Sequence, residues 1–250
     1  MKRKCFQCKP QPETLVTLLA LIGAILVNAL ANCFKGSLFV LFYQGVLVLG
    51  ICIFFPLYYI QNIKKESLNE IGLTTKGWFF ALLVGLIFAA VSVPGQIIHK
   101  TILFPSFDKL VYVTIALMMS ALFEELFFRG FLQTRFEKAF GIIPAVLLSG
   151  AAFSLYHLGY PKFRSVELLL MLFFVGTFLA ISFSITKNVI TSFTVNLPNA
   201  IITYIINPQQ FTDFNKVVAI ISFSTICIAI VIISLFKIKE TRNQAPAMTG

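Results

Sequence analysis

The chain has 250 residues, of which 58% are hydrophobic and only 12% are charged, and 28 of them are Phe. A soluble domain carries about one quarter charged residues, so this composition excludes a soluble globule, a disordered chain and a collagen-like chain. Lys and Arg number 20 against 10 Asp and Glu, which gives a net charge of +10. In a membrane protein that excess is expected at the cytoplasmic rim, and we expect no nucleic-acid partner.

Eight apolar runs approach the ~20 residues that a helix needs to cross the ~30 Å hydrocarbon core of a bilayer. These predicted spans are approximately Leu15–Phe34, Leu38–Ile60, Trp78–Ile98, Lys109–Phe140, Ile142–Leu158, Glu167–Ile185, Val189–Ile206 and Val217–Phe236. The runs are apolar all round, which predicts helices, because barrel strands would alternate apolar and polar residues over ~10 positions. The predicted fold class is an all-α, polytopic membrane protein with about eight transmembrane helices in the lipid bilayer.

The first run has a second interpretation as a signal peptide, since it follows a basic start and contains the small residues Ala29 and Ala31. Its apolar stretch exceeds the usual 7–15 residues of such peptides, which favours a transmembrane helix.

An even number of spans places both ends of the chain on one side of the membrane. Excess Lys and Arg mark the cytoplasmic side, so we predict that both termini are cytoplasmic. In that orientation, the opposite face receives only Lys35, Lys100, Lys109, Lys162, Arg164 and Lys216.

Two adjacent carboxylates, Glu124 and Glu125, lie inside the fourth apolar run. A carboxylate at membrane depth costs about 2.5–3.5 kcal/mol on the most lenient scale, so this pair is a candidate functional site. The alternative is that the helix ends near Phe123 and water solvates both groups.

The two glutamates are predicted to have different roles, because adjacent helical residues point about 100° apart. Glu125 and Arg129 stand at i and i+4 with the acid first, the favourable order for an ion pair. Glu124 is left without a cation and suits a general base that takes a proton from water.

His157 is the next ionisable group within the predicted membrane spans. If the chain turns at Gly141, Glu124 lies 17 residues before the turn and His157 lies 16 residues after it. In an antiparallel hairpin both would lie roughly 25 Å from the turn, at the same height. The alternative is an interfacial histidine at a helix end.

The seventh run contains Asn188, Asn196 and Asn199, with Pro198 between the last two. Amides in lipid are tolerated only when paired, so these side chains either hold helices together or serve a site. In a site, an amide N–H can donate to a developing oxyanion.

Two ordered motifs on consecutive spans carry a family resemblance. Glu124-Glu125-Leu-Phe-Phe-Arg129 resembles the EExxxR motif, and Phe153-Ser-Leu-Tyr-His157 the FxxxH motif, of the CPBP (CAAX protease and bacteriocin-processing, or Abi) family of intramembrane proteases. The resemblance implies that Glu124 and His157 are catalytic and activate a water for peptide hydrolysis. It implies that Glu125 and Arg129 support the site.

The resemblance covers roughly residues 70–206, including the segment Ile71–Trp78, which is similar to the lead-in of the family's core. It divides the chain into residues 1–70 (tail and two spans), 71–206 (protease core) and 207–250 (last span and tail). It also implies a multi-pass protein of the bacterial plasma (inner) membrane.

The third motif of the family, HxxxN or HxxxD, is degenerate here. Asn196 stands at its histidine position and Ala200 at its partner position. Asn196 would then be the remaining catalytic oxyanion donor, and Asn199 a supporting residue if Pro198 distorts the helix. Losing one oxyanion donor costs ~10²–10³ in rate, so a slow enzyme or an inactive relative is expected.

The predicted function is therefore an intramembrane endopeptidase. Its substrate would be a peptide or membrane-associated protein that approaches from the cytoplasmic side or within the bilayer. The alternative is a weak or inactive relative that acts in bacteriocin self-immunity or as a membrane scaffold. No cofactor is required in this interpretation, and zinc is a minority alternative because Glu124 and His157 give only two of the three usual protein ligands.

Overall fold

The computed structural model describes residues 4–98, 100, 102–207 and 215–244. These residues form helices joined by short connections and no β-strand, which confirms the predicted all-α class. The α-helices are α1 (Pro12–Ala31), α2 (Gly36–Val40), α3 (Phe55–Tyr58), α4 (Trp78–Ile97), α5 (Phe107–Glu124), α6 (Thr134–Phe140), α7 (Ile142–Tyr156), α8 (Val166–Thr186), α9 (Val189–Ile206) and α10 (Lys216–Gln244).

Within the described residues, eight helical segments are long and apolar enough to cross a membrane, as predicted, and the protein is a multi-pass integral membrane protein. The second span, Gly36–Ile63, is one continuous helix that includes α2, α3 and π-helical turns. The fourth, Phe107–Phe140, joins α5 and α6 through the π-helical stretch Glu125–Gln133. The last span continues past its predicted end at Phe236, because α10 extends through charged residues as far as Gln244.

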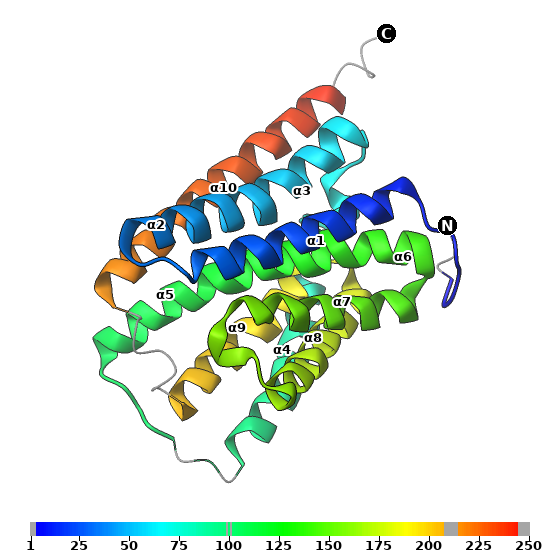
Figure 1. Cartoon of the computed structure of the whole chain (residues 1–250). Coiled ribbons are helices and arrows are strands. Elements are labelled where there is room, and N and C mark those ends of the chain that lie inside the picture. The colour runs from blue at the N-terminus through cyan, green and yellow to red at the C-terminus, as the bar shows by residue number, and fades with distance from the viewer. Residues whose placement is uncertain (1–3, 99, 101, 208–214, 245–250) are drawn as a thin grey trace.

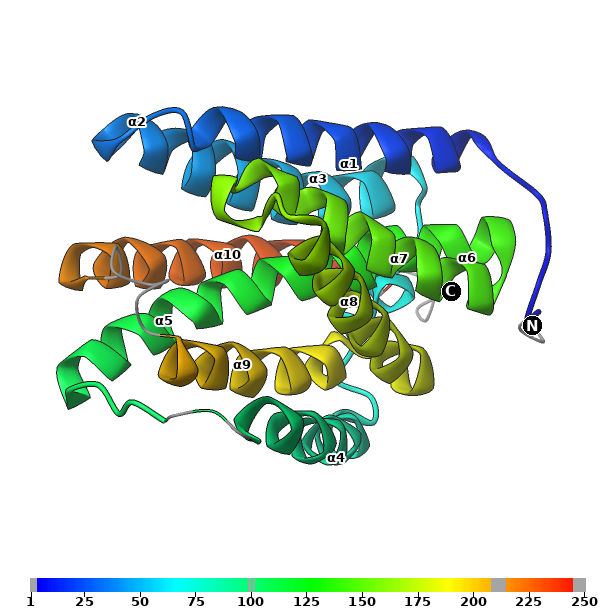
Figure 2. The ribbon, with the colours of Figure 1, turned by 60° about the horizontal axis from the view of Figure 1, so that its bottom comes forward.

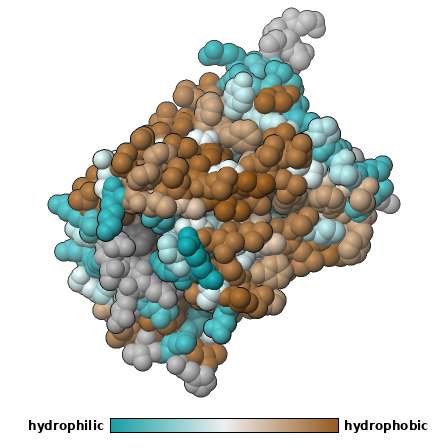
Figure 3. All heavy atoms as spheres, in the orientation of Figure 1, coloured by the Kyte–Doolittle hydropathy of each residue, from teal (hydrophilic) through white to brown (hydrophobic). Residues whose placement is uncertain are grey.

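Several helices of the bundle share one direction, and α8 is inclined to them (Figure 1, Figure 2). The start of α1 and the end of α10 lie at the same end of the bundle, as an even number of spans requires (Figure 2). Apolar side chains gather across the middle of the face in Figure 3, with hydrophilic residues toward the helix ends. This distribution fits a surface whose middle faces lipid.

The fourth and fifth spans form a hairpin that turns at Gly141, where φ is +90°. The segment of residues 4–9, here named the N-terminal strap, lies against this turn. The carbonyls of Lys4 and Cys5 accept hydrogen bonds from the first two N–H groups of α7, and the N–H groups of Gln7 and Lys9 donate to the last two carbonyls of α6. Backbone groups that helix ends leave unpaired thus find partners in the strap.

Small residues bring two helix pairs into close contact. A Cβ atom added at Gly85 of α4 would lie 2.7 Å from the carbonyl oxygen of Thr191 in α9. At the α7–α8 contact, a Cβ atom on Gly176 would lie 3.0 Å from the Cα atom of Gly150. These contacts fix α4 and α8 beside the helices that carry the polar residues.

A buried ionic network joins α1, α6 and the connection that follows the second span. The Arg135 guanidinium, which is fully buried, lies 3.0 Å from the Glu13 carboxylate and 2.7 Å from that of Glu66. Lys138 also contacts Glu66 at 2.9 Å, and Lys64 contacts Glu13 at 3.0 Å. Burial alone would raise the pKa of Glu66, but hydrogen bonds from Lys138 and Arg135 outweigh it and lower that pKa.

Candidate active site

Glu124 is the last residue of α5, and Glu125 begins the π-helical stretch that follows it. Both side chains are buried, with Glu124 9% exposed and Glu125 1% exposed. The helix does not end near Phe123, and the alternative of two solvated carboxylates therefore fails. A π-helical insertion inside an α-helix frequently marks a functional site.

Glu125 forms an ion pair with Arg129. The Arg129 Nε atom lies 3.4 Å from Glu125 Oε2, so the ion pair expected from the i, i+4 spacing is present. Arg129 Nη1 also donates to Ser149 Oγ at 2.8 Å, and the guanidinium lies 5.1 Å from the ring centroid of Phe153. Arg129 thereby connects the π-helical stretch to α7.

Asn196 of α9 contacts both glutamates. Its Nδ2 atom donates to Glu125 Oε1 at 2.8 Å and lies 3.4 Å from Glu124 Oε2. The two carboxylates therefore share one partner, although adjacent helical residues were expected to point well apart. A π-helix bonds i to i+5 and rotates less per residue than an α-helix, which brings consecutive side chains closer in direction.

His157 follows the last residue of α7 and is 8% exposed, so it is not an interfacial side chain open to water. Its Nδ1 atom lies 2.8 Å from the carbonyl oxygen of Phe153. A carbonyl only accepts hydrogen bonds, so Nδ1 carries the hydrogen in this contact. In the neutral ring, Nε2 is then the acceptor.

Ring contacts join the two helices of the hairpin, among them that of Phe128 with Tyr156, whose ring centroids are 5.3 Å apart. Phe128 contacts Phe153 with ring centroids 5.5 Å apart, and Phe123 contacts Tyr156 with centroids 6.4 Å apart. The residues that immediately follow this second pair are Glu124 and His157. These contacts bring the segments that carry Glu124 and His157 together, and the equal height of the two side chains stays a prediction.

Asn199 lies at the contact between α4 and α9, and its hydrogen bonds are made there. Its Nδ2 atom donates to Ser92 Oγ of α4 at 2.8 Å, and its Oδ1 atom accepts a hydrogen bond from Gln96. Pro198 stands within a continuous α9, and Ala200 packs against an apolar cluster that includes Val113 of α5. The structure therefore brings Asn196 to the acidic pair but sets Asn199 in the contact between α4 and α9.

The sequence analysis did not single out Asn28, a residue near the site. Asn28 of α1 is fully buried and donates from Nδ2 to the carbonyl oxygen of Tyr156 at 3.2 Å. It also abuts Gly159, where an added Cβ atom would lie 2.5 Å from the amide nitrogen of Asn28. A single amide inside a long apolar run was the available signal, because such a group needs a partner.

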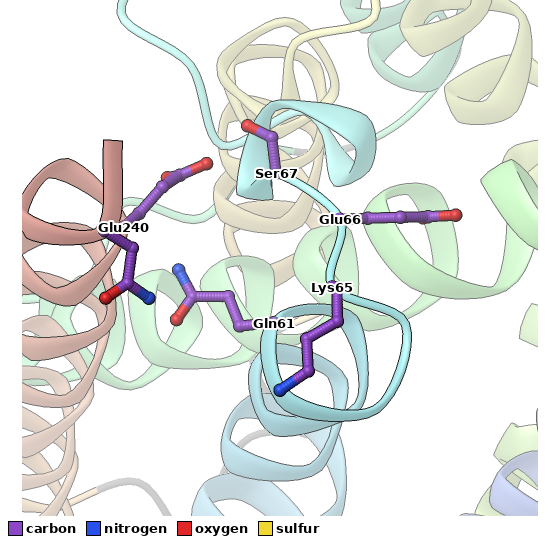
Figure 4. A pocket seen from close by; sticks show the side chains of 6 residues that line it. Gln61, Lys65, Glu66, Ser67 and Glu240 are labelled. Carbon is purple, nitrogen blue, oxygen red and sulfur yellow. The ribbon is translucent and has the colours of Figure 1, made fainter. Parts of the chain in front are cut away.

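Two pockets lie away from the acidic pair. One, of about 260 Å³, lies between the end of the second span and α10 and is lined by Gln61, Lys65, Glu66, Ser67, Glu240 and Asn243 (Figure 4). The other, of about 410 Å³, is an apolar groove between α7 and α8 that Thr177 and Ser184 also line. Glu124 and His157 line neither of them.

The donor set does not fit a catalytic zinc ion. Such a site uses three protein ligands, and the described residues hold no group of three His, Cys, Asp or Glu side chains placed to bind a metal. Glu125 is already engaged by Arg129.

A protein-family model matches part of the chain. Residues 105–197 match the family described as Rce1-like, type II CAAX prenyl endopeptidase, which is a protease family within the CPBP group. The matched segment contains Glu124, Glu125, Arg129, His157 and Asn196. Comparisons with curated proteins and with solved structures gave no match.

Proposed function

We propose that the protein is an intramembrane endopeptidase in which Glu124 and His157 activate a water molecule, on the premise that residues 105–197 match the Rce1-like family. The observation that carries the proposal is the buried Glu124 carboxylate. It lies beside an ion pair that occupies Glu125, on the hairpin that also carries His157.

The two proposed catalytic groups suit one water molecule. Water has two hydrogens, and both the Glu124 carboxylate and His157 Nε2 accept hydrogen bonds. A water held by both would direct a lone pair of its oxygen away from them, toward a substrate carbonyl carbon. The hydrogen bond from His157 Nδ1 to the Phe153 carbonyl supports this role, because it fixes the tautomer and the orientation of the ring.

In the proposed reaction, Glu124 takes a proton from this water as the oxygen forms a bond to the carbonyl carbon of the scissile peptide. The carbonyl π electrons move to its oxygen and create a tetrahedral oxyanion. Glu124 then gives the proton to the amide nitrogen, the C–N bond breaks, and the products are a carboxylic acid and an amine. The step consumes one water and balances without a further reactant.

Asn196 is the proposed oxyanion donor. Both hydrogens of its amide nitrogen point to carboxylates, but the contact to Glu124 is long, 3.4 Å against 2.8 Å for the contact to Glu125. The longer contact is the one that an oxyanion could replace once Glu124 is protonated, because a neutral carboxyl group is a weaker acceptor. Glu125 meanwhile holds the amide in place.

The proposed substrate is a peptide or membrane-associated protein that reaches the site from the cytoplasmic side or within the bilayer. The proposed cytoplasmic position of both termini rests on the distribution of Lys and Arg. The helix ends that carry the termini lie on one side of the bundle, which supports a common location for them (Figure 2).

A peptidase assay tests the proposal. The purified full-length protein is incubated with a fluorogenic peptide that ends in a prenylated CAAX sequence, beside its Glu124→Gln variant and in the presence and absence of a metal chelator. We expect hydrolysis by the wild type, none by the variant, and no effect of the chelator. The contrary outcome is a folded wild type that hydrolyses neither this peptide nor unprenylated membrane peptides in a Glu124-dependent reaction. That outcome would favour an immunity or scaffold role.

A further inference from the structure

Three tyrosine hydroxyl groups meet beside the proposed site. Tyr43 comes from the second span, Tyr156 ends α7, and Tyr160 lies in the connection that follows. The hydroxyl oxygen of Tyr160 lies 2.8 Å from that of Tyr43 and 3.3 Å from that of Tyr156. We call these three residues the tyrosine triad.

The triad contacts His157 and the residue that precedes Glu124. The rings of Tyr156 and Tyr160 contact the His157 ring, with centroids 5.4 and 5.7 Å apart. The rings of Tyr43 and Tyr156 contact Phe123, the residue before Glu124, at 6.3 and 6.4 Å.

Hydrogen-bond accounting leaves one donor of the triad unused. Each phenol has one O–H donor, so the triad has three, and the two contacts among its oxygens consume two of them. Tyr160 is central, and its oxygen has two lone pairs that can accept from Tyr43 and Tyr156 together. In that arrangement the O–H group of Tyr160 itself remains free to donate to a third partner.

The site lacks a donor where the family motif expects one. Position 200 holds Ala200, which packs against an apolar cluster of α5 and α9 residues, and the Asn199 side chain is hydrogen-bonded to Ser92 of α4. Asn196 is then the single amide on α9 that contacts the acidic pair within the described residues. A tetrahedral oxyanion is commonly stabilised by two donors, so a second donor from another element would complete the site.

We propose that the free O–H of Tyr160, held in place by Tyr43 and Tyr156, donates a hydrogen bond to the oxyanion and replaces the donor missing at position 200. This inference rests on the proposed peptidase function. Tyr160 keeps its proton throughout, and the hydrogen bond strengthens as negative charge develops on the substrate oxygen. The competing structural role, in which the hydroxyl groups only join three chain segments, would affect stability and leave turnover unchanged.

Phenylalanine substitutions separate the two roles. We would measure kcat, KM, the pH–rate profile and the melting temperature of the full-length protein with the prenylated CAAX peptide. Tyr160→Phe should lower kcat by about 10²-fold with KM and the pH profile unchanged. Tyr43→Phe and Tyr156→Phe, which leave the central donor in place, should lower kcat by less than about 10-fold. Tyr58→Phe is the matched control, because Tyr58 is exposed on the same span as Tyr43 and should behave as wild type.

The proposal is overturned if Tyr160→Phe turns over like Tyr58→Phe. It is also overturned if Tyr160→Phe shifts the acid limb of the pH profile but keeps the maximal rate, because the hydrogen bond would then go to Glu124. If Tyr160→Phe fails to fold, fluorotyrosine at position 160 keeps the hydroxyl and makes it a stronger donor, and an unchanged kcat would reject the proposal. If the wild type shows Glu124-dependent hydrolysis and Tyr160→Phe hydrolyses the peptide equally fast, this inference alone is rejected. If the wild type shows no such hydrolysis, the proposed peptidase function is rejected as well.

Discussion

Glu124 and Glu125 are chemically identical neighbours, and their surroundings distinguish them. Glu125 is almost fully enclosed and has a guanidinium 3.4 Å away, while Glu124 has one long contact, of 3.4 Å, to the Asn196 amide. A buried carboxylate with a cation is a structural group, and one without a cation is available for proton transfer. Replacing each glutamate by glutamine should therefore have different effects on activity and on stability.

Glu124→Gln should abolish hydrolysis and leave the melting temperature within a few degrees of wild type. Glu125→Gln should leave Arg129 as an uncompensated buried charge and lower the free energy of unfolding by ~3–5 kcal/mol. Thermal unfolding in detergent and the peptide assay, applied to both variants, check the difference. Equal losses of stability in the two variants would contradict it.

The two asparagines of α9 form a second matched pair. Asn196→Ala should lower turnover by ~10²-fold, because it removes the amide that contacts both carboxylates. Asn199→Ala removes hydrogen bonds to Ser92 and Gln96 and should reduce stability by about 1–3 kcal/mol with turnover kept within a few fold. Turnover and unfolding measured on both variants test this assignment, and a catalytic loss in Asn199→Ala alone would reverse it.

At the scale of elements, α4 is held to the bundle chiefly along one face. Gly85 allows the backbone of α9 to approach, whereas a Cβ atom added at Gly95 of the same helix would meet no atom within 4 Å. Gly85→Ala should force the helices apart and cost about 1–3 kcal/mol. Gly95→Ala should be neutral or slightly stabilising, since alanine is the better helix former. Chemical unfolding of the two variants checks the contrast, and equal effects would show that the close contact is not limiting.

The sequence predicted which segments are helices but not how they are wound. Hydropathy identified all eight spans, because burial in lipid depends on composition over ~20 residues. The π-helical winding at Glu125–Gln133 depends on the hydrogen-bond register, which composition does not encode, and so the shared contact of both glutamates with Asn196 was not foreseen. The contacts of the Asn199 side chain also could not be predicted, because they depend on which helix packs against its face of α9.

At the scale of the whole molecule, the network around Arg135 connects the first span to the hairpin. Glu66 contributes to it with a lowered pKa, so the folded state favours the charged carboxylate. Its stabilising contribution is therefore complete above the ordinary pKa of 4.5 and is lost as the pH falls through the lowered value.

Glu66→Gln should lower the free energy of unfolding by about 1–2 kcal/mol at pH 7. The difference from wild type should shrink as the pH falls below about 4.5, because the unfolded chain then binds a proton at Glu66 before the folded state does. Glu70→Gln is the control, because the Glu70 side chain is 52% exposed and its ion pair with Lys138 should contribute little. Melting curves from pH 3.5 to pH 7 check the effect, and a difference that does not change with pH would contradict it.

The N-terminal strap has a consequence for how the protein is made. The ribosome synthesises residues 4–9 first, yet their hydrogen-bond partners at the ends of α6 and α7 emerge only after more than half the chain has been translated. Four spans must be inserted before the strap can dock. The strap therefore has to remain on one side of the membrane, undocked, through most of translation, and its docking would report that the hairpin with the glutamates and the histidine has closed.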